Sequence, residues 1–151
     1  MTPSDDHPND DTWKLLIPHR GAMCLLDRVI AWDTARIHAR SESHRRADHP
    51  LRSDGKLRAV HLAEYGAQAM AVHGGLLAHV SGGVAAPGFL VSLRGVELGV
   101  ARIDDLAGSL EVYAEHLLGN ESGWQYEFRI EHDGFVIARG RAAVLVATGG
   151  A

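Results

Sequence analysis

The stretch that decides the fold is Leu57-Arg58-Ala59-Val60-His61-Leu62-Ala63-Glu64-Tyr65-Gly66-Ala67-Gln68-Ala69-Met70-Ala71-Val72-His73-Gly74-Gly75-Leu76-Leu77. Its alanine, leucine and methionine content favours a helix despite the glycines, and we expect this helix to run from Leu57 to Val80. Apolar side chains on nearly every face indicate that other structure encloses the helix. Glu64 stands near the middle of this element, where burial penalises a charge. The sequence therefore marks Glu64 as a candidate functional residue.

Three polar side chains share one side of the predicted helix. Steps of three and four residues return to the same face of a helix, which places His61, Glu64 and Gln68 on one stripe. In that arrangement Gln68 is placed to orient the carboxylate of Glu64 by hydrogen bonding. The structural alternative is a buried acid that pairs with an arginine such as Arg28 or Arg94, and both interpretations stay open at this point.

The composition fits one domain. The chain has 151 residues, and 46% of them are hydrophobic, which is enough for a single core. Residues Met1 to Asp11 are polar and carry four aspartates, so we expect a flexible N-terminal tail at 1–11 and one domain at 12–148.

Charge and hydropathy exclude several classes of protein. The net charge of −4 argues against a nucleic-acid surface, which needs a concentrated basic footprint. Polar residues interrupt the longest apolar stretch, so we predict no membrane span. A single cysteine, Cys24, and an acidic N-terminus favour a cytoplasmic setting. We also predict no metal site, because no His-x-His, His-x-x-x-His or Cys pair occurs.

Strand patterns flank the helix on both sides. Cys24 to Trp32 and Ala35 to Ser43 are predicted strands, and a polar loop from Ser43 to Lys56 leads into the helix. Four further strand candidates follow the helix: Phe89 to Val100, Ser109 to Leu118, Gly123 to His132 and Phe135 to Ala147. The hairpin-type signals between these four are Asp104-Asp105, Gly119-Asn120 and Asp133-Gly134, and Asp-Gly is the strongest of them.

This order of elements predicts an α+β domain. A long helix that is apolar all round must be covered, and a curved antiparallel sheet of about six strands wrapped around it is an economical cover. That arrangement is the hotdog fold, with one long central helix.

Two separated segments resemble the 3-hydroxyacyl-acyl-carrier-protein dehydratases. The central-helix motif of that family runs roughly Phe-Pro-Gly-Val-Leu-x-x-Glu-x-x-Ala-Gln, and Glu64 and Gln68 match its acid and its glutamine. The upstream segment Leu16-Ile17-Pro18-His19-Arg20, followed by Leu26-Asp27-Arg28-Val29, resembles the opening of the same family. The resemblance covers the chain from about Leu15 to Val146.

The chain departs from the family pattern at the catalytic loop. The family has Gly-His-Phe-Pro before the helix, and Pro50 occupies the position of that histidine, next to His49. Arg58-Ala59 replaces the Pro-Gly that opens the family's helix. The chain therefore looks most like a divergent branch, similar to the dehydratase-like proteins of bacterial aryl-polyene pathways.

The resemblance implies dehydration of 3-hydroxyacyl thioesters on acyl carrier protein to trans-2-enoyl thioesters. It implies a homodimer or a higher oligomer of dimers, and no cofactor besides the phosphopantetheine of the carrier protein. A histidine takes a proton from the carbon beside the carbonyl, and the acid protonates the departing hydroxyl. A carboxyl in apolar surroundings has a raised pKa, and this would suit Glu64 to the second step.

The candidate site residues follow from both arguments. Glu64 is the predicted acid, and the base is His49, from family topology, or His61, from spacing on the helix. The resemblance places Ala59, Val60 and Gln68 at the substrate, with the Ala59 N–H at the helix start polarising the thioester carbonyl.

Two other functions stay open. A hotdog thioesterase would use the same acid to activate water, and a non-catalytic subunit would support an active relative in a heteromeric dehydratase. Four arginines surround the predicted entrance, as a solvated face or as an attraction for an acidic carrier protein: Arg45, Arg46, Arg52 and Arg58.

Overall fold

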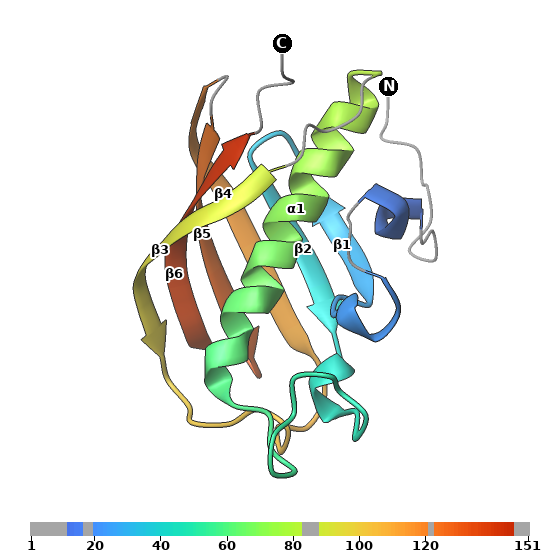
Figure 1. Cartoon of the computed structure of the whole chain (residues 1–151), viewed down its shortest axis with the longest axis vertical. Helices are drawn as coiled ribbons and strands as arrows, with labels where there is room; N and C mark the ends of the chain where they lie inside the picture. Colours follow the sequence, from blue (N-terminus) through green and yellow to red (C-terminus); the bar gives the residue numbers. More distant parts are fainter. Residues whose placement is uncertain (1–11, 17–19, 83–87, 121–122, 147–151) are drawn as a thin grey trace.

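The computed structural model describes residues 12–16, 20–82, 88–120 and 123–146 (Figure 1). The predicted tail at Met1 to Asp11 and the last two residues of the predicted domain lie outside the described residues. The strands are β1 (Arg28–Trp32), β2 (Arg36–Ser41), β3 (Gly88–Leu98), β4 (Leu110–Asn120), β5 (Gly123–His132) and β6 (Phe135–Val146). The helix α1 spans Leu62–Val80, and the short 3-10 helices are η1 (Thr12–Leu16), η2 (Gly21–Met23), η3 (Ser43–Arg45) and η4 (Ala59–His61).

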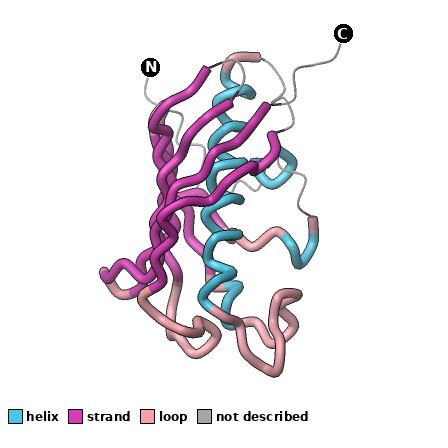
Figure 2. The backbone as a smooth tube through the Cα atoms, turned by 60° about the vertical axis from the view of Figure 1, so that its left-hand side comes forward, coloured by secondary structure: helices cyan, strands magenta, loops and turns pink. Residues whose placement is uncertain are grey.

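The strands form one antiparallel sheet in the order β1-β2-β4-β5-β6-β3. The sheet packs against α1 on one face, which we call the inner face (Figure 2). Side chains alternate between the two faces, and on β5 the inward residues Tyr126, Phe128 and Ile130 are fully buried. The predicted six strands and one long helix are therefore present. None of the helices in the described residues is long and apolar enough to cross a membrane.

The helix begins later than the sequence predicts. The backbone N–H of Leu57 donates to the Asp104 carboxylate, and the N–H of Ala59 donates to the carbonyl of Ala101. These partners hold the segment before η4 in an extended conformation, so α1 starts at Leu62 rather than at Leu57.

The first strand is also shorter than predicted. Cys24 to Asp27 precede β1, and the N–H of Leu25 donates to the side chain of Gln68 on the helix rather than to a neighbouring strand. Leu25 and Leu26 are fully buried, whereas Asp27 is exposed and its N–H donates to the carbonyl of Arg40 on β2.

One of the predicted hairpins is wrong. β3 pairs with β6 at the edge of the sheet and β4 pairs with β2 and β5, so Asp104-Asp105 turns within a connection that crosses from the edge to the middle. The Asp133-Gly134 hairpin is confirmed, with φ values of 50° and 80° that suit a two-residue turn. Gly119-Asn120 extends β4, and the two residues that follow lie outside the described residues.

A phenyl ring sets the spacing between helix and sheet. A Cβ at Gly66 of α1 would lie 2.6 Å from Cγ of Phe128, and a Cβ at Gly140 of β6 would lie 2.8 Å from Cζ of the same ring. Both glycines are therefore required by close approach, since any larger residue would meet the ring.

We expect Gly66→Ala to destabilise the protein although alanine is the better helix former. Overpacking costs about 1–3 kcal/mol, which outweighs the gain of about 1 kcal/mol in helix propensity. Gly74→Ala is the matched control, because its Cβ would lie at an ordinary 3.4 Å from Trp124. Urea denaturation should show a lower free energy of unfolding for the first variant and an equal or higher one for the second. A stabilised Gly66→Ala would contradict the steric argument.

Candidate active site

Glu64 lies in the first turn of α1 and is partly buried. The Nε2 of Gln68 donates to Oε1 of Glu64 at 3.2 Å, so the hydrogen bond expected from their spacing is present. Nε2 of Gln68 also donates to the carbonyl of Met23 at 2.7 Å, and its Oε1 accepts from the N–H of Leu25 at 2.8 Å. Gln68 is fully buried, and its amide therefore joins α1 to residues 23–25 while it orients the carboxylate.

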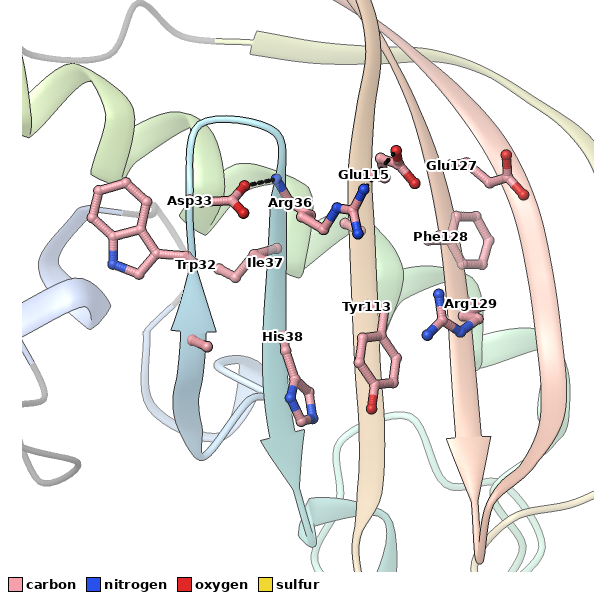
Figure 3. A pocket seen from close by; sticks show the side chains of 12 residues that line it. Trp32, Asp33, Arg36, Ile37, His38, Tyr113, Glu115, Glu127, Phe128 and Arg129 are labelled. Carbon is pink, nitrogen blue, oxygen red and sulfur yellow. Dashed lines mark hydrogen bonds and ion pairs between the residues drawn. The ribbon is translucent and has the colours of Figure 1, made fainter.

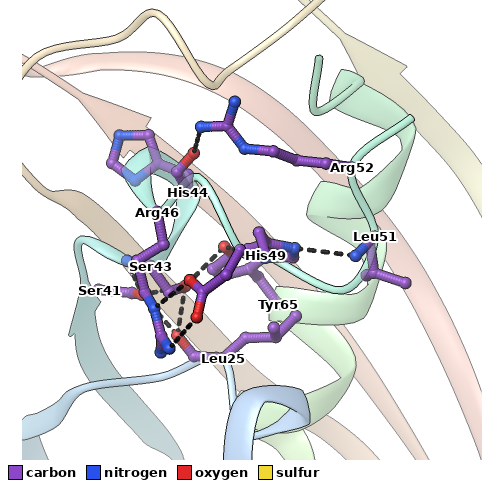
Figure 4. Close-up of polar contacts among 10 residues, drawn as sticks. Leu25, Ser41, Ser43, His44, Arg46, His49, Leu51, Arg52 and Tyr65 are labelled. Atoms are coloured by element: carbon purple, nitrogen blue, oxygen red, sulfur yellow. Dashed lines mark hydrogen bonds and ion pairs between the residues drawn. The ribbon is translucent and has the colours of Figure 1, made fainter. Parts of the chain in front are cut away.

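His49 is held in the loop before the helix, and only 5% of its surface is exposed. Its Nε2 lies 3.1 Å from the hydroxyl of Tyr65 on α1, and its Nδ1 accepts the backbone N–H of Leu51 at 3.1 Å (Figure 4). Burial, followed by repulsion from His61 and nearby arginines, lowers the pKa of His49 to about 4. The ring is therefore neutral at neutral pH.

The hydrogen bonds of His49 fix its tautomer. Because Nδ1 accepts from a backbone N–H, the hydrogen of the neutral ring is on Nε2 and is donated to Tyr65. The hydroxyl of Tyr65 in turn lies 2.7 Å from Ser43, whose hydroxyl donates to the carbonyl of Leu25 at 2.7 Å. The chain runs from His49 through Tyr65 and Ser43 to a backbone acceptor, and both nitrogens of His49 are engaged.

Tyr65 is the central member of this chain. It is fully buried, and desolvation raises its pKa to about 12, so its hydroxyl stays protonated and can donate to Ser43. Ser41 adds a second donor to the same carbonyl of Leu25. This buried network ties the loop, the helix and the residues before β1 together.

His61 differs from His49 in its exposure and in its hydrogen bonds. It is the last residue of η4, immediately before α1, and it is partly exposed. No hydrogen bond to its ring occurs within the described parts of the chain. It precedes Glu64 by three residues at the start of α1, and its proximity is among the causes that lower the pKa of His49.

The backbone N–H groups of Ala59 and Val60, at the start of the helix, differ in whether they already form a hydrogen bond. Ala59 is buried, and its N–H is engaged by the carbonyl of Ala101 at 3.0 Å. Val60 is 58% exposed, and its N–H makes no hydrogen bond to any described residue. Of the two predicted substrate contacts, Val60 thus offers a donor, whereas Ala59 would have to give up a bond.

Three of the four entrance arginines have partners inside the chain. Arg45 lies 3.7 Å from Glu42, and Arg46 lies 3.2 Å from Asp48. Arg52 donates to the carbonyls of Gly55 and His44, although its Nε is buried without a partner among the described residues. Arg58 is exposed.

A hollow of about 320 Å³ lies elsewhere, on the outer face of the sheet across β2, β4 and β5 (Figure 3). Its lining includes His38, Tyr113 and Arg129 and none of the predicted site residues. We therefore do not place the chemistry there. Within the described residues, no group of three or more His, Cys, Asp or Glu side chains is arranged to hold a metal ion.

Sequence reasoning missed Tyr65, Ser41 and Ser43. In the sequence pattern Tyr65 is one of many apolar residues of the predicted helix. Ser41 falls in a predicted strand and Ser43 at the start of the predicted loop, and nothing local marks either serine as functional. Ser43 and Tyr65 are 22 positions apart, so no local pattern predicts their contact.

The sequence of residues 12–149 matches the profile of the ApeP-like family, described as ApeP dehydratase. The chain belongs to the ApeP-like dehydratase family. The predicted resemblance to a divergent dehydratase branch is therefore confirmed. No curated protein matches this ApeP-like chain at a significant level.

Solved structures similar to the ApeP-like chain confirm its fold. The dehydratase heterocomplex ApeI:P from Xenorhabdus doucetiae matches with a TM-score of 0.80 and 24% identity over 91% of each chain. A putative thioesterase from Shewanella oneidensis matches with a TM-score of 0.62 and 12% identity over 91% of this chain and 93% of that one. The α+β hotdog fold predicted from the order of elements is therefore correct.

We expect Tyr65→Phe to lower the free energy of unfolding by about 1–3 kcal/mol, because the buried N–H of His49 would lose its acceptor. Tyr113→Phe is the control, since no hydrogen bond involves the Tyr113 hydroxyl in the described structure. Urea denaturation of both variants measures the difference. Equal stabilities would show that the chain through Tyr65 contributes nothing to the fold.

Proposed function

We propose that this ApeP-like chain dehydrates 3-hydroxyacyl thioesters carried on acyl carrier protein to trans-2-enoyl thioesters. The observation that carries the proposal is the carboxylate of Glu64, partly exposed in the first turn of α1 and oriented by a buried amide. The match to the ApeP-like dehydratase family supports the reaction class. Phosphopantetheine on the carrier protein would deliver the substrate, and the setting would be the cytoplasm.

Glu64 would act as the acid. In the reaction a base removes the proton from the carbon beside the carbonyl, the C–O bond to the 3-hydroxyl breaks, and water leaves after the acid protonates that oxygen. The hydrogen bond from Nε2 of Gln68 engages Oε1 of Glu64 and orients the carboxylate. Gln68 is fully buried, so its contribution would be to position Glu64.

His61 would be the base if this chain supplies one. A base needs a nitrogen lone pair, and both nitrogens of His49 are engaged, Nδ1 by Leu51 and the Nε2 hydrogen by Tyr65. The ring of His61 is partly exposed and close to Glu64 in sequence and on the helix. His49 would then be a positioning residue that holds the loop against α1.

Charge that develops on the thioester oxygen needs a donor. The unengaged N–H of Val60 and the positive end of the α1 dipole are both at the start of the helix. Val60 is therefore a better placed donor than Ala59, whose N–H is bound to Ala101.

A second chain would cover the flank beside this site. Three apolar side chains on the inner face of β3 remain partly exposed: Leu93 at 41%, Val96 at 38% and Leu98 at 41%. Val60, at the start of the helix, is 58% exposed. We call these four residues the open flank. Inward-facing apolar side chains with this much exposure are typical of an interface, which supports a dimer with the site at its boundary.

We expect Glu64→Gln to reduce enoyl formation by at least about a hundredfold with an unchanged melting temperature, because general acid catalysis contributes about 10²–10⁴-fold. The assay is turnover of a 3-hydroxyacyl carrier-protein substrate, with mass spectrometry of the products. Glu97→Gln, exposed on β3, is the control. An unaffected rate would remove Glu64 from the mechanism, and release of free acid instead of enoyl product would indicate a thioesterase.

A second candidate is a heteromeric dehydratase in which this chain is a supporting subunit. The engaged nitrogens of His49 favour it, since a partner of different sequence would then supply the base. The structural match to a protein described as a dehydratase heterocomplex agrees with this candidate. Turnover only after addition of such a partner would select it over the first proposal.

Paired alanine variants separate the two histidines. We expect His61→Ala to lower the turnover rate about a hundredfold or more without a change in stability. We expect His49→Ala to lower the free energy of unfolding, because Tyr65 and Leu51 each lose a buried partner. The opposite pattern, with full activity in His61→Ala and a stable but inactive His49→Ala, would return the base to His49.

A further inference from the structure

The segment that leads to the Val60 N–H is held by a neighbouring stretch of backbone. It pairs with the connection between β3 and β4, residues 99–109, which passes close to the start of α1 in Figure 1. Two backbone hydrogen bonds form this pairing: the N–H of Ala59 to the carbonyl of Ala101 at 3.0 Å, and the N–H of Ile103 to the carbonyl of Leu57 at 2.9 Å. The pairing ends one residue before Val60, so it determines the direction of the Val60 N–H.

Asp104 extends this pairing with its side chain. Its Oδ1 accepts the backbone N–H of Leu57 at 2.9 Å. The same carboxylate accepts Nε of Arg102 at 3.0 Å and a second hydrogen bond from Nη2 of Arg102, and only 6% of the Asp104 side chain is exposed. The hydrogen bonds from Arg102 hold the pKa of the Asp104 carboxyl well below its ordinary value. The N–H of Leu57 therefore donates to an ionised acceptor, which makes this bond stronger than one between neutral groups.

The carboxylate of Asp104 also lies beside the loop that carries His49. Nη1 of Arg52 is 4.0 Å from Oδ2 of Asp104. Arg52 donates to the carbonyls of Gly55 and His44 within the loop (Figure 4). The loop, the start of the helix and the β3–β4 connection thus meet at this one carboxylate.

Two histidines anchor the β3–β4 connection to the rest of the fold. Nε2 of His44 lies 3.0 Å from the carbonyl of Leu106, and Nε2 of His132 lies 2.6 Å from the carbonyl of Ala107. A carbonyl can only accept, so both Nε2 atoms donate. Because the connection is fixed at these points, the position of Asp104 is set by the connection and not by the segment that it holds.

We propose that Asp104 is a positioning residue of the thioester site, which holds the segment before α1 so that the N–H of Val60 points at the carbonyl of the substrate. The inference rests on the proposed dehydration and adds the group that places its backbone donor. Asp104 acts through Leu57 and the pairing at Ala59, and it does not itself contact the reacting atoms. Displacement of a catalytic group by about 1 Å can cost about a hundredfold in rate, so a firm hold on this segment matters for turnover.

A purely structural ion pair with Arg102 is the alternative role for Asp104. In that role the charge of the carboxylate matters, and the place of its oxygen does not. Two variants separate the roles, because Asp104→Asn keeps an oxygen at the position of Oδ1 and removes the charge, whereas Asp104→Glu keeps the charge and moves the oxygen by one methylene group. Positioning predicts that Asp104→Asn is the more active variant, and a structural ion pair predicts the reverse.

The kinetic test is turnover of a 3-hydroxyacyl carrier-protein substrate by the full chain. We expect Asp104→Ala to lower kcat about tenfold or more with KM changed less than about twofold, because the donor acts mainly in the transition state. Asp104→Asn should stay within about threefold of the wild-type kcat, and Asp104→Glu should lose more. Asp105→Ala is the control and should have the wild-type kcat, since its carboxylate is 57% exposed and lies 3.8 Å from Arg102.

The stretching frequency of a bound thioester carbonyl reports the donor without turnover. The probe is a saturated acyl pantetheine thioester with an isotope-labelled carbonyl, which has no 3-hydroxyl to lose. A hydrogen bond to the carbonyl oxygen lowers this frequency. We expect the wild type and Asp104→Asn to lower it in infrared difference spectra, and Asp104→Ala and Asp104→Glu to lower it less.

Three results would overturn the role of Asp104. The first is an equal kcat and an equal carbonyl frequency in the wild type and Asp104→Ala. The second is a higher kcat for Asp104→Glu than for Asp104→Asn. The third is a carbonyl frequency that binding to the wild type leaves unshifted, because Val60 would then not be the donor. Melting curves by circular dichroism check folding, and if Asp104→Ala does not fold, the order of the other two variants decides.

Failure of the proposed dehydration gives a different result. A wild type that lowers the carbonyl frequency but forms no enoyl product, or that releases free acid from the probe, contradicts dehydration. The carbonyl frequencies of the variants then decide the role of Asp104 by themselves, since any reaction at a thioester carbonyl uses the same donor.

Discussion

The buried amide of Gln68 is the interaction on which the rest of the site depends. Its three hydrogen bonds reach a carbonyl at Met23, an N–H at Leu25 and the carboxylate of Glu64. Residues 23–25 are thereby fixed against α1, and Leu25 in turn provides the carbonyl on which the chain from His49, Tyr65 and Ser43 ends. One side chain thus connects Glu64, the helix α1 and, through Leu25, the loop that carries His49.

The architecture could be predicted because it depends on patterns that span many residues. The apolar stretch around Glu64, the alternation in β5 and the Asp133-Gly134 turn each signal one element, and their order specifies a sheet around a helix. The predictions were wrong where a single long-range contact determines the end of an element. The Asp104 carboxylate and the Ala101 carbonyl delay the start of α1, and neither lies close in sequence to the residues that they bind.

The candidate site could be predicted only in part, for the same reason. Spacing alone places Gln68 next to Glu64, and that contact is present. The protonation and tautomer of His49 depend on Tyr65, Leu51 and Ser43, which fold together from a strand end, a loop and a helix. No reading of the loop sequence distinguishes a histidine with a free lone pair from one whose nitrogens are both engaged.

The ring of Phe128 between Gly66 and Gly140 has a mechanical consequence for the carboxylate. A helix that lies on a smooth apolar surface can roll about its long axis at little cost, but a ring seated in a glycine notch resists both rolling and sliding. Glu64 precedes Gly66 by two residues, which is about 200° around the helix, so it points away from the sheet. Phe128 therefore fixes the rotational orientation of α1, and with it the direction of the Glu64 side chain, from the opposite side of the helix.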